Sequence, residues 1–213
     1  MNVRLSSLTG RAARAVVLTG LVVVLGSGCR PAASPASVPT SAAQLAPLIV
    51  PDVPSGLARL PDTALDPPAG AKGLDDVAGY STDAPHQRDV LADFGYRFGW
   101  ERFWGMQSGP MTGVFVDEFT GRAGAAGYSA DLAANEQGRY GGVLRVAPQG
   151  LPGACRLLTV AAGSSGRLHG PASLVWCPHG VFSVSVVAMA SSAEAADAEM
   201  RAVLAHQLAR LPG

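Results

Sequence analysis

The sequence predicts an α+β domain: an antiparallel sheet of about five strands with two or three helices packed on one face, preceded by a disordered stalk. Segments with alternating apolar residues are joined by short turns, which favours antiparallel strand pairing. Other segments repeat apolar residues at helical spacing, most clearly near the C-terminus. Residues 31–68 are rich in proline, alanine and serine, a composition typical of chain outside a packed core.

Capping and turn residues set the boundaries of the predicted elements. Asp83 is suited to cap a helix that Gly95 ends, and Ser191 with Glu194 matches a capping box before the last helix. Gly124 weakens the middle helix, so tertiary packing must hold that helix. In chain order we expect helix 84–94, strands 96–104 and 112–119, helix 122–134, a loop over 135–142, a short strand 143–146, strands 155–160 and 172–177, strand 181–190 and a final helix after residue 191.

Two of the three cysteines lie on adjacent strands of this arrangement. If the hairpin between them is symmetric about Gly166, Cys155 lies opposite Cys177. Opposed residues of antiparallel strands have Cα atoms about 4.5–5.5 Å apart, a distance that a disulfide can bridge. We therefore predict a Cys155–Cys177 disulfide, with two free thiols or a redox pair as the alternatives. A two-residue turn that begins at His179 then places Phe182 opposite Cys177.

The N-terminal residues have the features of an export signal. Three arginines precede an uncharged apolar run over residues 15–25, which is shorter than the roughly 20 residues needed to span a bilayer. The predicted organisation is a signal peptide over 1–28, a lipidated cysteine with a Pro/Ala-rich linker over 29–69, and a single α+β domain over 70–213. Residues 45–50 form an apolar island that either docks on the domain or begins its first strand.

The end of the apolar run is more specific. Leu25, Gly26, Ser27 and Gly28 place small residues directly before Cys29. This run resembles the lipobox of bacterial lipoproteins. The resemblance implies transfer of diacylglycerol to the Cys29 thiol, cleavage after Gly28, and a lipidated Cys29 as the new N-terminus. The alternative is an ordinary signal peptide that happens to be followed by a cysteine.

The composition of the whole chain is similar to that of uncharacterised lipoproteins of high-GC Gram-positive bacteria. Lys72 is the single lysine, while alanine, glycine and arginine are abundant and the stalk is rich in proline and alanine. This resemblance implies a location on the extracytoplasmic face of the cell membrane, with the lipid anchor as the membrane partner. It transfers no binding site to this chain.

Aromatic residues are concentrated on strand 96–104. Trp and Tyr offer large rigid contact area, so this strand is either a binding wall or the aromatic core of the domain. Arg102 interrupts the apolar face and a buried cation must be paired, so we expect an ion pair with Asp117 or Glu118, or else a bound carboxylate or phosphate. The candidate ligand-binding residues are Trp100, Arg102, Trp104, Phe115 and Tyr128.

Several classes of function have no signature in the sequence. A formal net charge of +0 argues against a nucleic-acid partner. No phosphate loop or dinucleotide fingerprint is present, so we expect no cofactor. The four histidines are scattered, so we expect no metal site. The Gly163–Gly166 loop lacks the spacing of a nucleophile elbow, and no residue is predicted to be catalytic.

Three hypotheses for function follow. The first is a membrane-anchored extracytoplasmic lipoprotein whose domain binds an envelope protein or molecule without catalysis. The second is a carrier of a small apolar ligand, or a transport accessory protein, with a cavity between helices and sheet lined by Trp100, Trp104, Phe115 and Tyr128. The third is a cell-envelope hydrolase, which would require a polar cleft that brings Asp117, Glu118 and a histidine together.

Overall fold

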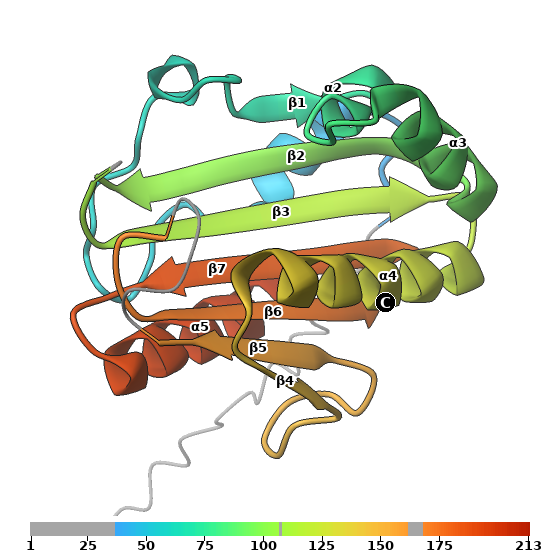
Figure 1. Cartoon of the computed structure of the whole chain (residues 1–213). Helices are drawn as coiled ribbons and strands as arrows, with labels where there is room; N and C mark the ends of the chain where they lie inside the picture. The colour runs from blue at the N-terminus through green and yellow to red at the C-terminus, as the bar shows by residue number, and fades with distance from the viewer. Residues whose placement is uncertain (1–36, 107, 162–167) are drawn as a thin grey trace, which may run out of the picture. The chain divides into compact units, whose positions relative to one another are not determined.

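Figure 1 shows the computed structural model of the chain, which describes residues 37–106, 108–161 and 168–213. The described residues all belong to one structural unit. The predicted signal peptide and Cys29 lie outside the described residues, and so does the Gly163–Gly166 loop. The α+β class is confirmed, with helices and one antiparallel sheet.

The sheet has seven strands rather than about five. Their spatial order is β1-β2-β3-β7-β6-β5-β4, and all neighbours are antiparallel. Strand β1 was not predicted, because its three residues carry no alternating pattern that sequence alone could distinguish from the linker. The strands are β1 (Gly70–Lys72), β2 (Tyr96–Gly105), β3 (Met111–Phe119), β4 (Val143–Val146), β5 (Arg156–Val160), β6 (Ala172–His179) and β7 (Phe182–Met189).

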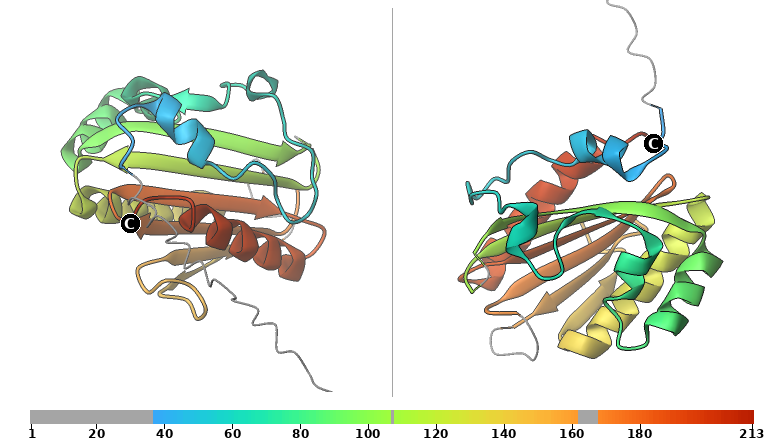
Figure 2. Two further views of the ribbon diagram at one scale, coloured as in Figure 1. Left: turned by 180° about the vertical axis from the view of Figure 1, so that it is seen from behind. Right: turned by 90° about the horizontal axis from the view of Figure 1, so that it is seen from above.

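Helices cover both faces of the sheet, whereas one covered face was expected. Helices α3 and α4 lie on one face, and α1 with α5 lies on the other, as the edge-on view in Figure 2 shows. The reason is visible in β5, where the successive residues Leu157 and Leu158 point to opposite faces and are both buried. The helices are α1 (Ala42–Leu45), α2 (Leu74–Ala78), α3 (Ala84–Phe94), α4 (Arg122–Tyr140) and α5 (Ala193–Leu208), with short 3-10 turns η1 (Ala46–Leu48) and η2 (Asp62–Ala64).

Local signals placed both ends of α3 correctly. Asp83 accepts a hydrogen bond from the main-chain N–H of His86 at 3.2 Å, and Gly95 ends α3 in the left-handed conformation at φ 76°. Ser192 rather than Ser191 caps α5, through a bond from the N–H of Ala195 at 3.2 Å. Helix α4 continues through most of the residues that were expected to form a loop. Among the described residues, no helix is both long and apolar enough to cross a membrane.

The packed part of the chain begins well before residue 70, where the sequence placed the start of the domain. Leu45, Ile49, Val50 and Val53 are at most 5% exposed and belong to the same apolar cluster as α5 and the sheet. The apolar island in the proline-rich segment therefore docks on the domain, one of the two outcomes expected for it. It can do so because four large apolar side chains bury enough area to offset the ordering of a short segment.

The cysteine hairpin has the predicted register. Arg156 lies opposite Trp176, which places Cys155 opposite Cys177, and the two form a disulfide with their Cα atoms 4.2 Å apart. The next turn differs from the expectation, because Val184 rather than Phe182 lies opposite Cys177. This shift of two residues keeps Phe182 and Val184 on the predicted face, since side chains alternate with a period of two.

Candidate functional site

Strand β2 carries three of the candidate binding residues on one face of the sheet. Trp100, Arg102 and Trp104 are alternate residues and therefore point the same way. Trp104 is fully buried, while Trp100 is half-buried against the same apolar cluster. This face is covered by α5 and by the N-terminal segment that includes α1 and η1 (Figure 2).

Arg102 binds the main chain of that segment. Its guanidinium donates to the carbonyl oxygens of Val50 at 3.0 Å, Ile49 at 3.2 Å and Ala46 at 3.1 Å. The expected ion pair with Asp117 or Glu118 is wrong, although the expectation that a buried Arg102 needs partners holds. Burial lowers the pKa of Arg102 by removing the cation from water, and the positive charges of Arg59 and Arg210 add to this fall while Asp62 opposes it.

Three further side chains hold the same segment. Gln207 on α5 accepts from the N–H of Val50 and donates to the carbonyl of Leu48, both at 3.0 Å. Arg210 donates to the carbonyl oxygens of Leu48 at 3.1 Å and Pro47 at 2.6 Å. The Trp104 indole N–H donates to the carbonyl of Pro51 at 3.2 Å.

We call residues 46–51 the strap, and Arg102, Trp104, Gln207 and Arg210 the clamp. Every residue of the strap has a main-chain atom bonded to a clamp side chain. Buried carbonyl groups need partners, and side chains supply them here in place of a neighbouring strand. The clamp therefore recognises an extended main chain rather than particular side chains.

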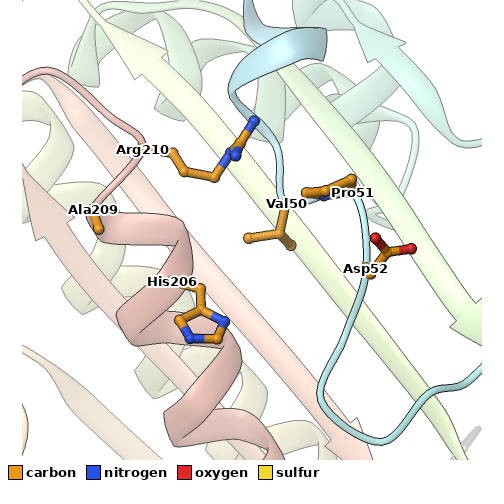
Figure 3. A pocket seen from close by; sticks show the side chains of 6 residues that line it. All are labelled: Val50, Pro51, Asp52, His206, Ala209 and Arg210. Atoms are coloured by element: carbon orange, nitrogen blue, oxygen red, sulfur yellow. The ribbon is translucent and has the colours of Figure 1, made fainter.

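A depression of about 350 Å³ adjoins the strap on the α5 side. Figure 3 shows the Arg210 side chain extending from the end of α5 toward the strap, with His206 one turn earlier on the helix. Asp52, just after the strap, also lines the depression. The sequence did not identify Gln207 or Arg210 as members of a site, because a polar residue near the end of a helix carries no mark of the segment that will pack against it.

Phe115 and Tyr128 do not join the other candidate residues. Phe115 lies on the opposite face of the sheet, where its ring meets that of Phe103 edge-on at 5.3 Å. Tyr128 on α4 packs against Phe119 with ring centroids 5.1 Å apart. The sheet separates these side chains from Trp100 and Trp104, so the common cavity expected for a carrier is not formed by these four residues.

Two buried carboxylates lie on the face opposite the strap. Glu101 accepts from the Tyr80 hydroxyl at 2.9 Å and is 3.4 Å from the Lys72 ammonium. Asp117 is also buried, and the missing Cβ of Gly99 makes room for its carboxylate beside the Tyr96 hydroxyl. Burial raises the pKa of Asp117 to about 8, and the charge of Glu101 adds to this rise.

Glu118 faces the other way. It is fully buried on the strap side of the sheet and pairs with Arg97, while its Oε2 atom has no hydrogen-bond partner among the residues that the structure describes. Because Asp117 and Glu118 are successive residues of one strand, their side chains point to opposite faces. Asp117 and Glu118 therefore do not share the polar cleft that the hydrolase hypothesis requires.

Metal-ligating side chains are dispersed. Across the described ranges, no group of three or more His, Cys, Asp or Glu side chains is arranged to hold a metal ion. Of the carboxylates whose pKa burial raises, Glu101 and Asp117 have a lysine and tyrosines as polar neighbours.

Comparisons with known proteins do not place the chain in a family. No family model matches it, and no curated protein matches its sequence. One solved structure that it resembles is the crystal structure of the extracellular domain of PknH from Mycobacterium tuberculosis. The two are 12% identical, the match covers 67% of this chain and 78% of that chain, and the TM-score is 0.38.

Proposed function

We propose that this chain is a lipid-anchored protein of the extracytoplasmic face of the cell membrane, and that its α+β domain binds a partner without catalysis. The export features of residues 1–28 and the lipobox-like run that ends at Cys29 support the anchor. The buried Cys155–Cys177 disulfide supports an oxidising compartment, since such bonds are rare in the cytosol.

The clamp on the strap is the observation that carries the proposal. Within the described ranges, the strap is the first main-chain segment after Cys29 that the domain holds by a network of side chains. The chain between Cys29 and Ala46 can span at most about 60 Å, because an extended residue covers about 3.5 Å. A lipid on Cys29 would therefore keep the domain near the membrane surface, with the clamp as its point of attachment.

Binding is favoured over catalysis by where the acidic side chains lie. Glu101 is bonded by Tyr80 and Lys72 inside the domain, and Glu118 is paired with Arg97. A general acid or base has to reach a substrate proton, directly or through one water. Carboxylates that are already bonded within a packed domain are suited to holding the fold together.

Cell fractionation tests the anchor. We expect the wild-type chain to be in the membrane fraction with a mature N-terminus at Cys29 and a mass increased by the attached acyl chains. The variant Cys29→Ser should lose the added mass and move to the soluble extracytoplasmic fraction, because the thiol that accepts the lipid is gone. Unchanged membrane retention with an unmodified N-terminus would contradict the anchor.

A matched control separates anchoring from folding. The double variant Cys155→Ser, Cys177→Ser removes the disulfide and leaves Cys29 in place. We expect this variant to keep the lipid mass and the membrane location. If it left the membrane as Cys29→Ser does, fractionation would be reporting misfolding rather than loss of the lipid.

A further inference from the structure

Strand β4 forms one edge of the sheet. It pairs with β5, and no strand of the described ranges pairs with its other side. Edge strands carry main-chain N–H and C=O groups that can accept another strand. Val143 and Val146 at this edge are 55% and 68% exposed, which makes them two of the most exposed large apolar residues described.

The pattern of hydrogen bonds shows which main-chain groups are free to pair outward. The N–H of Ala147 donates to the carbonyl of Cys155 at 3.0 Å, so residue 147 faces β5. In an antiparallel ladder the bonding direction alternates along the strand. Arg145 and Val143 therefore bond toward β5, and the N–H and C=O groups of Leu144 and Val146 point away from the sheet.

Positive charge flanks this edge on both faces of the sheet. Arg145 lies opposite Leu157 on the strap side, and Arg156 lies opposite Val146 on the other side. Neither arginine takes part in an ion pair among the described residues. Beside Arg145 is a depression of about 510 Å³ that is also lined by Arg201, whose charge is paired with Asp197.

A second copy of the chain is a poor occupant for this edge. Antiparallel pairing of two β4 strands through Leu144 and Val146 would place Arg145 directly opposite the same residue of the other copy. Like charges in that position are destabilising. A strand with acidic side chains would instead meet Arg145 on one face and Arg156 on the other.

We propose that the β4 edge binds an extended acidic peptide segment of a partner protein, which adds an eighth strand to the sheet. This inference rests on the proposed binding function and names its partner by chemistry. Main-chain bonds to Leu144 and Val146 supply affinity, as in other β-strand additions, and the two arginines select acidic side chains. The exposed valines bury apolar side chains of the added strand.

A designed peptide tests the edge directly. Each face of the edge offers one valine and one arginine, so the probe is an eight-residue peptide in which pairs of Glu alternate with pairs of Val. Binding to the full chain is measured by fluorescence anisotropy, with the same peptide carrying Lys in place of Glu as the comparison. We expect the acidic peptide to bind, and the basic peptide to bind at least about tenfold more weakly.

Two variants and one matched control locate the binding on β4. Val146→Pro removes an outward N–H without touching the β4–β5 bonds, so it should weaken binding at least about tenfold, while Val146→Thr should not. Arg145→Glu keeps every main-chain group and should shift the binding preference toward the basic peptide. This variant therefore tests binding at the β4 edge even if Val146→Pro folds poorly. Melting temperatures of all variants are measured alongside.

Several results would overturn the inference. One is that the acidic peptide does not bind at concentrations up to about 1 mM, and another is that the acidic and basic peptides bind equally well. A third is that the Val146→Pro variant is folded and binds the acidic peptide as tightly as the wild-type protein does. Self-association that Val146→Pro abolishes would assign the edge to a second copy instead. Fractionation of Cys29→Ser tests the lipid anchor independently. A negative result in the peptide assay would therefore not contradict the proposed lipid-anchored location.

Discussion

The side-chain amide of Gln207 accepts a hydrogen bond from the main-chain N–H of Val50 at 3.0 Å, across 157 positions of sequence. The same amide donates to the carbonyl of Leu48 at 3.0 Å. An amide can accept and donate at once, so it matches a peptide main chain in a way that a carboxylate or an apolar side chain cannot. Gln207 thereby joins the last helix to the strap.

Removal of the Arg102 side chain should destabilise the domain. Arg102→Ala leaves the buried carbonyls of Ile49 and Val50 without their donors, and we expect a loss of about 2–4 kcal/mol in the free energy of unfolding, measured by urea denaturation. Arg59→Ala removes an exposed pair with Asp62 and should cost less than about 1 kcal/mol. Equal effects of the two substitutions would mean that the clamp does not stabilise the fold.

Two glycines of α4 should respond in opposite ways to alanine. A Cβ at Gly124 would lie 1.9 Å from the carbonyl oxygen of Phe94 on α3, so Gly124→Ala should lower the melting temperature by forcing the helices apart. A Cβ at Gly138 would meet nothing within 4 Å, so Gly138→Ala should stabilise the protein by up to about 1 kcal/mol through helix propensity. Calorimetry of both variants checks this, and stabilisation by Gly124→Ala would contradict the close contact between α3 and α4.

Reduction of the disulfide should lower stability. The bond joins residues separated by 22 positions, and closing a loop of that size restricts the unfolded chain by about 3 kcal/mol in the entropic account. We expect dithiothreitol to lower the melting temperature of the wild-type protein and to leave that of the Cys155→Ser, Cys177→Ser variant unchanged. A wild-type melting temperature that is the same with and without reductant would refute this.

Stability should fall as pH rises through the neutral range. Burial raises the pKa of Asp117 from 3.8 to about 8, so between these values the native state holds a proton that the unfolded state has released. The free energy of unfolding therefore decreases from about pH 4 to about pH 8 by up to about 1.4 kcal/mol per pH unit and then levels off.

Substitution at position 117 tests the assignment of this pH dependence. Asp117→Asn removes the titrating group, so the stability of this variant should vary less with pH than that of the wild-type protein. The variant should gain most stability relative to wild type at alkaline pH. The exposed Asp93 offers a control, since Asp93→Asn should keep the wild-type slope. The free energy of unfolding is measured by urea denaturation at about pH 5 and about pH 8. The assignment fails if this free energy changes equally between the two pH values in Asp117→Asn and in the wild-type protein.

Short-range signals in the sequence predicted much of the fold. Asp83 and Gly95 delimit α3 as expected, because capping and left-handed conformation depend on neighbouring residues. The hairpin register that joins Cys155 to Cys177 follows from counting residues about the turn. The number of strands was underestimated at the edges, where β1 has only three residues.

The candidate site was predicted less completely. Trp100, Arg102 and Trp104 share a face as their alternation on one strand requires, but Phe115 and Tyr128 lie on the other side of the sheet. Whether a strand presents one or both faces to helices depends on the elements that pack against it. The alternation of side chains does not contain that information.

The sequence by itself determined the alternating strands, the caps of α3, the cysteine pairing and the expectation that a buried Arg102 must have partners. Only the tertiary structure decided that those partners are the carbonyls of the strap rather than Asp117 or Glu118. The physical reason is that a carboxylate is visible in a sequence as Asp or Glu, whereas every residue has a carbonyl oxygen. Which carbonyls are buried beside a given arginine is settled only when distant segments pack together.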